Sequence, residues 1–450
     1  MDVSLAAATP APARRFLPPG WPIHILILGY PVWWFIGLSN FGWLLCAVPM
    51  VVYLVIRGDL RIPHGFGIWI CFLLWMFASS IEVQHATNFL TFGFRAACYL
   101  SATIWFLYVL NLPGGARTTR RIVFLLCALW LIIVAGGYAG LKFSHLSFSS
   151  LLELILPAGV GTSDFFHLQI HPQFAEIQTF IGYTIARPSA PFPYTNWWGG
   201  NLGALTPFMF AALFLVRSTW SKAVVWGLLA VALAPMVLSV NRGLWISLGI
   251  GLLYALYRFL LWGNIRLVMT VFGALLVVAT VILLSPLRTT IQARVEHPGS
   301  TNVRYSVAQA AVQGVQKSPI FGYGVPVKPP KHYGIPNVGT GGLYWLVMFT
   351  TGIPGLIFFA GWFLLALWAS RKALTPVMFW AHVSILIVMA QMFVYDMLPV
   401  ELHVLMIIVA LAYREGVTGS GQRSLGRRQE TRPRPLRAQE VALPAAATTS

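Results

Sequence analysis

Charged residues are scarce in this 450-residue chain, and acidic residues are the scarcest. Only 9% of the residues are Asp, Glu, Lys or Arg, whereas 58% are hydrophobic. A soluble domain carries about 25% charged residues, so this composition excludes a soluble globular fold. Apolar runs of about twenty residues recur along the chain, which is typical of a polytopic helical membrane protein.

Cysteine is also rare, and its placement excludes a disulfide framework. Cys46, Cys71, Cys98 and Cys127 fall in different apolar runs, and none has a CxxC partner. We interpret them as small apolar packing residues. The net charge of +18 would suggest nucleic acid as a partner of a soluble protein. Here the location of the basic residues relative to the apolar runs explains it better, and no nucleic acid is expected.

Hydropathy predicts an all-α fold, a polytopic transmembrane bundle of about 12 spans with two long external loops that contain short helices. The expected spans cover residues 22–38, 40–56, 65–81, 89–112, 121–141, 197–216, 223–240, 244–261, 265–284, 342–368, 376–395 and 402–413.

The spans define the domain organisation. In chain order we expect a cytoplasmic arm (1–21), N-terminal spans (22–141), an external lid-like loop (142–196), further spans (197–284), an external catalytic-type loop (285–341), C-terminal spans (342–413) and a disordered basic cytoplasmic tail (414–450). Placing the N-terminus in the cytoplasm puts most of the 30 basic residues on that side. Both termini are therefore expected in the cytoplasm, with the chain in the cytoplasmic (inner) membrane.

The second external loop carries an arginine near the start of a predicted helix. Asn302 is placed to cap a helix over Tyr305–Lys317, and Arg304 would lie in its first turn. The glycine-rich turn Phe321–Gly324 follows. A guanidinium beside free backbone N–H groups suits a phosphate. The alternative is an ordinary surface arginine.

A similar arrangement joins two spans at the external face. Arg242 lies at the expected start of a helix that Ser239 or Asn241 would cap, and Gly243 leaves space beside it. An interfacial arginine that snorkels toward the headgroups is the alternative, but such arginines are commoner on the cytoplasmic side.

Arg95 is the clearest charge inside a predicted span. A mid-span arginine is costly, so it normally faces a polar cavity or a partner. It would contact an anionic headgroup from within the membrane, or it would pair with the backbone or with Ser and Thr neighbours in a structural role.

The first external loop is too apolar for a simple tether, which favours interfacial helices or a lid on the bilayer surface. It contains Asp164, His167 and His171 at ligand-like spacing, and histidines at i and i+4 on a helix can bind zinc. Pro172 follows directly and no HExxH glutamate is present. We therefore expect no metal and no cofactor.

The order of several short motifs resembles the O-antigen ligase and polymerase superfamily. It consists of Asn241-Arg242-Gly243 between two spans, Arg304 at a helix start, Ser318-Pro319-Ile320-Phe321-Gly322-Tyr323-Gly324, a span that begins Leu343-Tyr344-Trp345, and Thr351-Gly352-Ile353-Pro354-Gly355. The resemblance covers roughly residues 195 to 370, and the first half of the chain matches only in its pattern of spans.

The resemblance implies a membrane glycosyltransferase of the cell envelope, with a fold akin to other polyprenyl-sugar transferases. The donor would be a glycan on undecaprenyl pyrophosphate, the acceptor a glycan or glycolipid, and membrane lipids the remaining partner. Arg242 and Arg304, at the family's motif positions, would hold the pyrophosphate with Asn241 beside them, and Arg95 is a further candidate contact.

One family position differs. The family commonly has a His-Asn pair about eleven residues before the glycine that is Gly352 here, and this chain has Gly341-Gly342 in that place. That histidine is the family's usual candidate for activating the acceptor. His332 in the same loop is the candidate catalytic residue in its stead, and the alternative is a solvated loop histidine.

A transporter or flippase of a lipid-linked glycan is the alternative function, and a structural or regulatory membrane protein is a third. Transport would be favoured by internal repeats and by polar groups at the membrane midplane. No repeat is evident, and the notable polar groups gather at the outer face, which favours an enzyme. The sequence leaves open the sugar, the acceptor and the choice between ligation and polymerisation.

Overall fold

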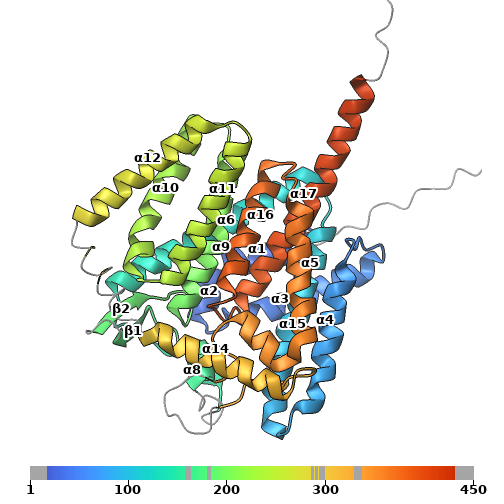
Figure 1. Cartoon of the computed structure of the whole chain (residues 1–450), viewed down its shortest axis with the longest axis vertical. Coiled ribbons are helices and arrows are strands. Elements are labelled where there is room, and N and C mark those ends of the chain that lie inside the picture. Colours follow the sequence, from blue (N-terminus) through green and yellow to red (C-terminus); the bar gives the residue numbers. More distant parts are fainter. Residues whose placement is uncertain are drawn as a thin grey trace, which may run out of the picture.

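A computed structural model describes residues 18–157, 164–179, 184–284, 288, 292, 299–328 and 337–430. His332 lies outside these residues, so its predicted role stays a prediction. The described chain is mainly helical, as the sequence predicts, with one small sheet (Figure 1).

In chain order, the described elements are α1 (Trp21–Leu28), α2 (Tyr30–Phe35), α3 (Gly42–Arg57), α4 (Phe66–Ala78), η1 (Ser79–Glu82), α5 (Ala86–Asn111), α6 (Gly115–Lys142), α7 (Leu151–Ile155), α8 (Asp164–Ile170), β1 (Ala175–Thr179), β2 (Thr184–Pro188), α9 (Thr195–Leu215), α10 (Thr219–Leu238), α11 (Arg242–Leu261), α12 (Ile265–Leu284), α14 (Gly299–Lys317), α15 (Leu343–Ser370), α16 (Pro376–Gln391) and α17 (Val400–Glu430).

Every predicted span coincides with helical structure, but the described residues contain six helices that are long and apolar enough to cross a membrane: α5, α6, α9, α10, α11 and α15. Shorter apolar helices accompany them. The expected span 22–38 is divided into α1 and α2 at Gly29. Pro31, near the start of α2, has no N–H to continue the hydrogen-bond ladder of α1, which accounts for the break.

Helix α9 lies at the centre of the bundle, between α6 and α16. Its glycines admit polar side chains from neighbouring helices, because a Cβ atom at Gly199 or Gly200 would collide with Asn241 or Glu401 respectively. Helices α10 and α11 are much less buried and stand with α12 to one side of the molecule (Figure 1). The core is therefore built around α9, α16 and α17.

The segment 142–196, expected as the first external loop, contains a β-hairpin that the all-α prediction missed. Strands β1 and β2 pair antiparallel, with Ala175 opposite Pro188 and Glu176 opposite Arg187. Polar Glu176 and Gln178 alternate with Ile177, a two-residue period that indicates a strand. The expected short helices are present as α7 and α8.

Helix α17 extends into the segment for which composition predicts a disordered tail. It continues to Glu430, and residues 431–450 lie outside the described part of the chain. The buried first turns of α17 supply the helix nucleus, so each added residue costs little. Arg, Gln, Leu and Glu, which favour helix, are frequent between 420 and 430.

The segment 285–341, expected as the second external loop, is fastened to a break in α15 through its turn 318–324. Gly352 has φ 70°, and a Cβ atom there would collide with the carbonyl of Ile320. Pro354 cannot donate to the carbonyl of Thr350, which instead accepts from Gly324 N at 2.9 Å. The carbonyl of Phe349 accepts from Tyr323 N at 3.0 Å. Two glycine motifs that lie apart in the sequence thus form one backbone lock, which we call the glycine lock (turn 318–324 on residues 349–353).

Candidate functional site

The turn before α11 lies at the lower end of the bundle in Figure 1, where α14 and the hairpin also lie. Arg242 is the first residue of α11, and Asn241 caps the helix, its Oδ1 accepting from Leu244 N at 3.4 Å. Val240 precedes the cap with φ 51°, a conformation that is strained for a β-branched residue. The predicted helix start is confirmed, with Asn241 rather than Ser239 as the cap.

The side chain of Asn241 forms hydrogen bonds that link three segments. Its Oδ1 also accepts from the hydroxyl of Tyr395, and its Nδ2 donates to the carbonyl of Thr195 at 3.1 Å. The side chain is only 2% exposed. Sequence reasoning placed Asn241 with the donor, whereas these contacts direct its side chain to α9 and to the segment after α16.

Tyr395 is itself fixed by the N-terminus of α15. Its carbonyl accepts from Leu343 N at 2.7 Å, and the carbonyl of Met392 accepts from Tyr344 N at 3.2 Å. These bonds satisfy N–H groups that the first turn of a helix leaves without partners. Gly342 permits the close approach, since a Cβ atom there would lie 2.6 Å from the carbonyl oxygen of Phe393.

Arg304 approaches Tyr395 from α14. Its Cζ lies 5.9 Å from the centre of the Tyr395 ring. Helix α14 begins at Gly299, earlier than expected, so Asn302 is inside the helix and its carbonyl accepts from Ser306 Oγ. Asn302 is therefore not the cap, and Arg304 lies in the second turn. Capping preference is a local effect, and the packing of the apolar face of α14 on α15 overrides it here.

Arg187 on β2 is a functional candidate that sequence reasoning missed. It is 5% exposed, its Nε donates to the carbonyl of Ser239 at 2.9 Å, and its Nη1 donates to Gln178 Oε1 at 2.9 Å. The hairpin is thereby tied to the turn that presents Arg242. The strand period around Ile177 was the one available signal, and it gives no indication of where the hairpin packs.

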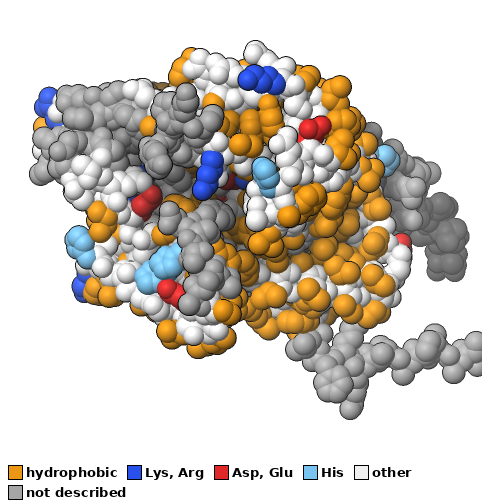
Figure 2. All heavy atoms as spheres, turned by 90° about the horizontal axis from the view of Figure 1, so that it is seen from below, with side chains coloured by type: hydrophobic (Ala, Val, Ile, Leu, Met, Phe, Trp, Pro, Cys, Tyr) orange, Lys and Arg blue, Asp and Glu red, His pale blue; other side chains and the backbone are white. Residues whose placement is uncertain are grey.

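The three arginines share one electrostatic environment. Burial lowers the pKa of Arg187, and the positive charges of Arg304 and Arg242 lower it further. Glu176 and Tyr395 act in the opposite direction and raise the pKa of Arg187. Arg242 and Arg304 also interact with each other. Seen from below, a basic side chain borders a hollow in this face (Figure 2). We call Arg187, Arg242 and Arg304 the arginine cluster.

Arg95 lies on α5, and its strongest electrostatic contact is not with the arginine cluster. Its electrostatic partner is Asp396, the residue after Tyr395. Its Nη1 is buried and has no hydrogen-bond partner among the described residues. Neither expected role names this partner, because the sequence suggested a headgroup or the backbone and Ser or Thr neighbours, so a contact of Arg95 with the donor stays a prediction.

Gly341, in the place of the family's histidine, borders α14. A Cβ atom there would lie 3.4 Å from Val307 Cγ1 and 3.7 Å from the carbonyl oxygen of Arg304. A side chain at this position would therefore stand beside the arginine cluster. The chain carries no titratable group at that point.

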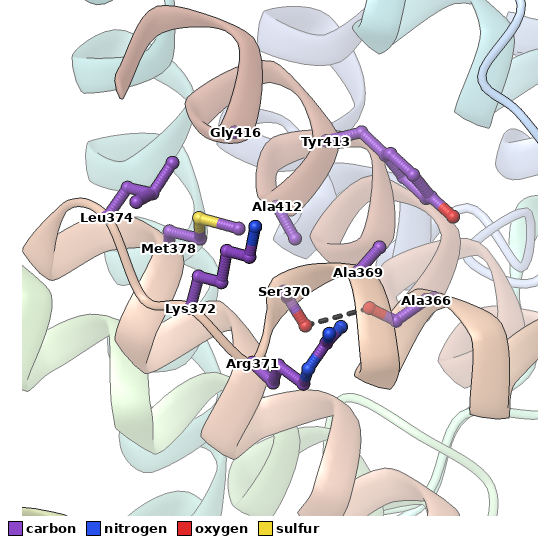
Figure 3. Close-up of a pocket in the computed structure, with 10 residues that line it drawn as sticks. All are labelled: Ala366, Ala369, Ser370, Arg371, Lys372, Leu374, Met378, Ala412, Tyr413 and Gly416. Atoms are coloured by element: carbon purple, nitrogen blue, oxygen red, sulfur yellow. Dashed lines mark hydrogen bonds between the residues drawn. The ribbon is translucent and has the colours of Figure 1, made fainter. Parts of the chain in front are cut away.

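A cavity of about 410 Å³ lies at the opposite end of α15, α16 and α17 (Figure 3). Its lining consists of Ala366, Ala369, Ser370, Arg371, Lys372, Leu374, Met378, Ala412, Tyr413 and Gly416. Since the arginine cluster adjoins the start of α15 and the end of α16, this cavity is separate from it.

A second group of polar side chains gathers in the segment 142–196. His167 and His171 lie beside Glu153. The side chain of Asp164, which the sequence grouped with the two histidines, is outside the described part of the structure. The expectation of no metal rests on Pro172 and on the missing HExxH glutamate, and it does not consider Glu153, which lies far from the histidines in the sequence. Ser150 and Glu153 form an S-x-x-E helix start, which was the available signal for α7.

A comparison with known families connects these observations. Residues 227–360 match the family model described as O-antigen ligase. The matched region contains Arg242, Arg304 and both halves of the glycine lock, whereas Arg187 precedes it. The resemblance to the O-antigen ligase and polymerase superfamily is thus confirmed over these residues. No curated protein matches the chain.

Proposed function

We propose that this chain transfers or polymerises a glycan from an undecaprenyl-pyrophosphate-linked donor, on the external face of the cytoplasmic membrane. An O-antigen ligase or polymerase type of membrane function is supported by the match over residues 227–360. The observation that carries the proposal is the meeting of Arg187, Arg242 and Arg304 beside Tyr395.

Three guanidinium groups from separate segments repel one another, and their mutual repulsion disfavours the empty site. A bound anion removes this cost. Pyrophosphate is well suited, because it carries several negative charges and offers oxygens for bidentate contacts with guanidinium groups. Arg242 adds the N-terminus of α11, whose dipole also favours negative charge.

The chemistry follows from this placement. The acceptor hydroxyl oxygen would form a bond to the anomeric carbon while the bond from that carbon to the pyrophosphate oxygen breaks. The bonding electrons stay on polyprenyl pyrophosphate, where the arginine cluster would stabilise the growing charge. The hydroxyl proton passes to a base, for which we propose His332.

Transport of a lipid-linked glycan is the second candidate, because ionisable groups are also buried inside the bundle. Both carboxylate oxygens of Glu401 on α17 are buried and have no hydrogen-bond partner among the described residues. Asp396 and Arg95 lie close to each other nearby. Ionisable residues within membrane helices are typical of ion-coupled transporters.

The location of the accumulated precursor in a deletion strain separates the two functions. Loss of a transferase leaves lipid-linked glycan on the outer leaflet, whereas loss of a flippase leaves it on the inner leaflet. We expect outer-leaflet accumulation, reversed by the wild-type gene and by Arg266→Lys, a change at an exposed arginine of α12. Complementation by Arg304→Lys should fail. Inner-leaflet accumulation, or unchanged precursor, would exclude glycan transfer.

A further inference from the structure

We propose that Glu153, His167 and His171 form a zinc-binding site in the first external segment. The three side chains come from α7 and from the end of α8, and their ligand atoms all lie within 4.8 Å of one another. Histidine side chains adjoin an acidic side chain on the face seen from below (Figure 2). Neither the family match, which begins at residue 227, nor the proposed glycan transfer involves these residues.

The two histidines contact different oxygens of the Glu153 carboxylate. His167 Nε2 lies 3.3 Å from Glu153 Oε1, and His171 Nδ1 lies 2.9 Å from Glu153 Oε2. The imidazole rings are stacked, with centres 4.8 Å apart and planes inclined by 17°. Zinc bound at about 2.0–2.1 Å with tetrahedral angles separates its ligand atoms by about 3.4 Å, so small side-chain movements suffice to surround an ion.

The backbone beneath the cluster is held in place independently of any ion. Ser150 Oγ accepts from Glu153 N at 3.2 Å and donates to the carbonyl of Ile170, which joins the start of α7 to the end of α8. The N–H of Leu152 donates to the carbonyl of Ile36 at 3.1 Å. The ligands are therefore positioned before binding, which lowers the entropic cost of assembling the site.

The ligand set favours zinc over magnesium or calcium. Two imidazoles and one carboxylate match the His₂Glu arrangement of zinc sites that leave a fourth position for water, whereas magnesium and calcium prefer oxygen ligands. The side chains of Glu153, His167 and His171 are 21%, 45% and 24% exposed, so an ion can enter from the external solution. A hydrogen-bonded ion pair without metal is the competing account.

A bound zinc would cross-link the two short helices that lead into the hairpin. Residue Gln173, two positions after His171, forms a β-bridge with Ser147 and donates from Nε2 to the carbonyl of Pro193 at 2.8 Å. The site therefore lies at the root of the segment that carries Arg187. Its expected role is to stabilise this segment, and its test does not depend on glycan transfer.

The experiment uses full-length protein without a histidine tag, purified in detergent, stripped with a chelator and titrated with Zn²⁺ alone. We expect one tightly bound zinc per chain by elemental analysis and calorimetry. Glu153→Gln, His167→Ala and His171→Ala should each weaken binding at least about tenfold, since even outer-shell changes cost 10–100-fold. His145→Ala, an exposed histidine of the same loop, should bind like the wild type.

Gel filtration will reveal any variant that fails to fold. A second measurement, made on the wild type, tests the proposal even if a variant is lost in this way. Co²⁺ bound in place of zinc should give the visible absorption of a four-coordinate site with nitrogen and oxygen ligands. Zinc should raise the unfolding temperature of the wild type and of His145→Ala but not that of His171→Ala. Failure of the stripped wild type to bind zinc, or equal binding by all variants, would overturn the proposal.

Discussion

The two long segments 142–196 and 285–341 are fastened to the bundle by different physical means. The second segment is fastened by backbone contacts, in which the turn 318–324 docks on the break at Gly352. The first segment has the backbone bond from Leu152 N to the carbonyl of Ile36, and side chains anchor it further: Asn40 Nδ2 donates to Gln169 Oε1 at 2.5 Å, and Trp34 packs edge-on against Phe148 and Phe174. Each segment then contributes one arginine beside Arg242.

This difference explains why the sequence identified the candidate arginine of only one segment. A backbone lock requires glycine at fixed positions, so it leaves a motif that can be recognised. Side-chain anchors can be built from many residue pairs, so they leave none. Arg304 was therefore found from the sequence and Arg187 was not.

The largest effect should come from breaking the glycine lock. Gly352→Ala places a Cβ atom against the carbonyl of Ile320 at a positive φ, which costs about 1–3 kcal/mol in strain before the turn is displaced. We expect little folded protein in the membrane and a large fall in unfolding temperature. The matched control is Gly361→Ala in the same helix, where an added Cβ atom would lie 3.5 Å from Ile68 Cγ2, an ordinary van der Waals contact. Similar behaviour of the two variants would contradict the lock.

A smaller effect on folding but a strong one on activity is expected at Arg187. Arg187→Lys keeps the charge and loses the paired donors to Ser239 and Gln178. Glycan transfer should fall by about ten- to a hundredfold, consistent with misplacement of a substrate-positioning group, while membrane levels stay normal. Arg266→Lys is the control for arginine replacement as such.

Normal transfer by Arg187→Lys would mean that only the second of the two segments contributes to donor binding. The first would then be a cover over the site, and the donor would be held from α11 and the second segment alone.

The smallest effect is expected at the anchor of the first segment. Asn40→Leu or Gln169→Leu alone should cost about 1–3 kcal/mol of unfolding free energy, because each leaves a buried polar partner unsatisfied. The double variant should be nearly neutral, since Asn40 Oδ1 and Gln169 Nε2 have no hydrogen-bond partner among the described residues. Denaturant unfolding of the four proteins measures the coupling, and strictly additive costs would contradict a direct bond.

The helices were more predictable than the site. Apolar runs fix where helices form, and Asn241 signalled the start of α11 because capping is local. The start of α14, the hairpin and the partner of Arg95 depend on contacts between residues distant in the sequence, which no local pattern records. Glu153 is the same case, lying 18 residues from His171 in the sequence but 2.9 Å from it in space.

The central claim is that arginines from separate segments hold one pyrophosphate, and binding of undecaprenyl pyrophosphate to purified protein in nanodiscs tests it most directly. The wild type and Arg266→Lys should bind the pyrophosphate more tightly than undecaprenyl monophosphate. Arg242→Lys and Arg304→Lys should each weaken binding about tenfold or more, and the double change should cost less than the sum because one ligand is shared. Equal affinity of all variants, or no preference for pyrophosphate, would contradict the account.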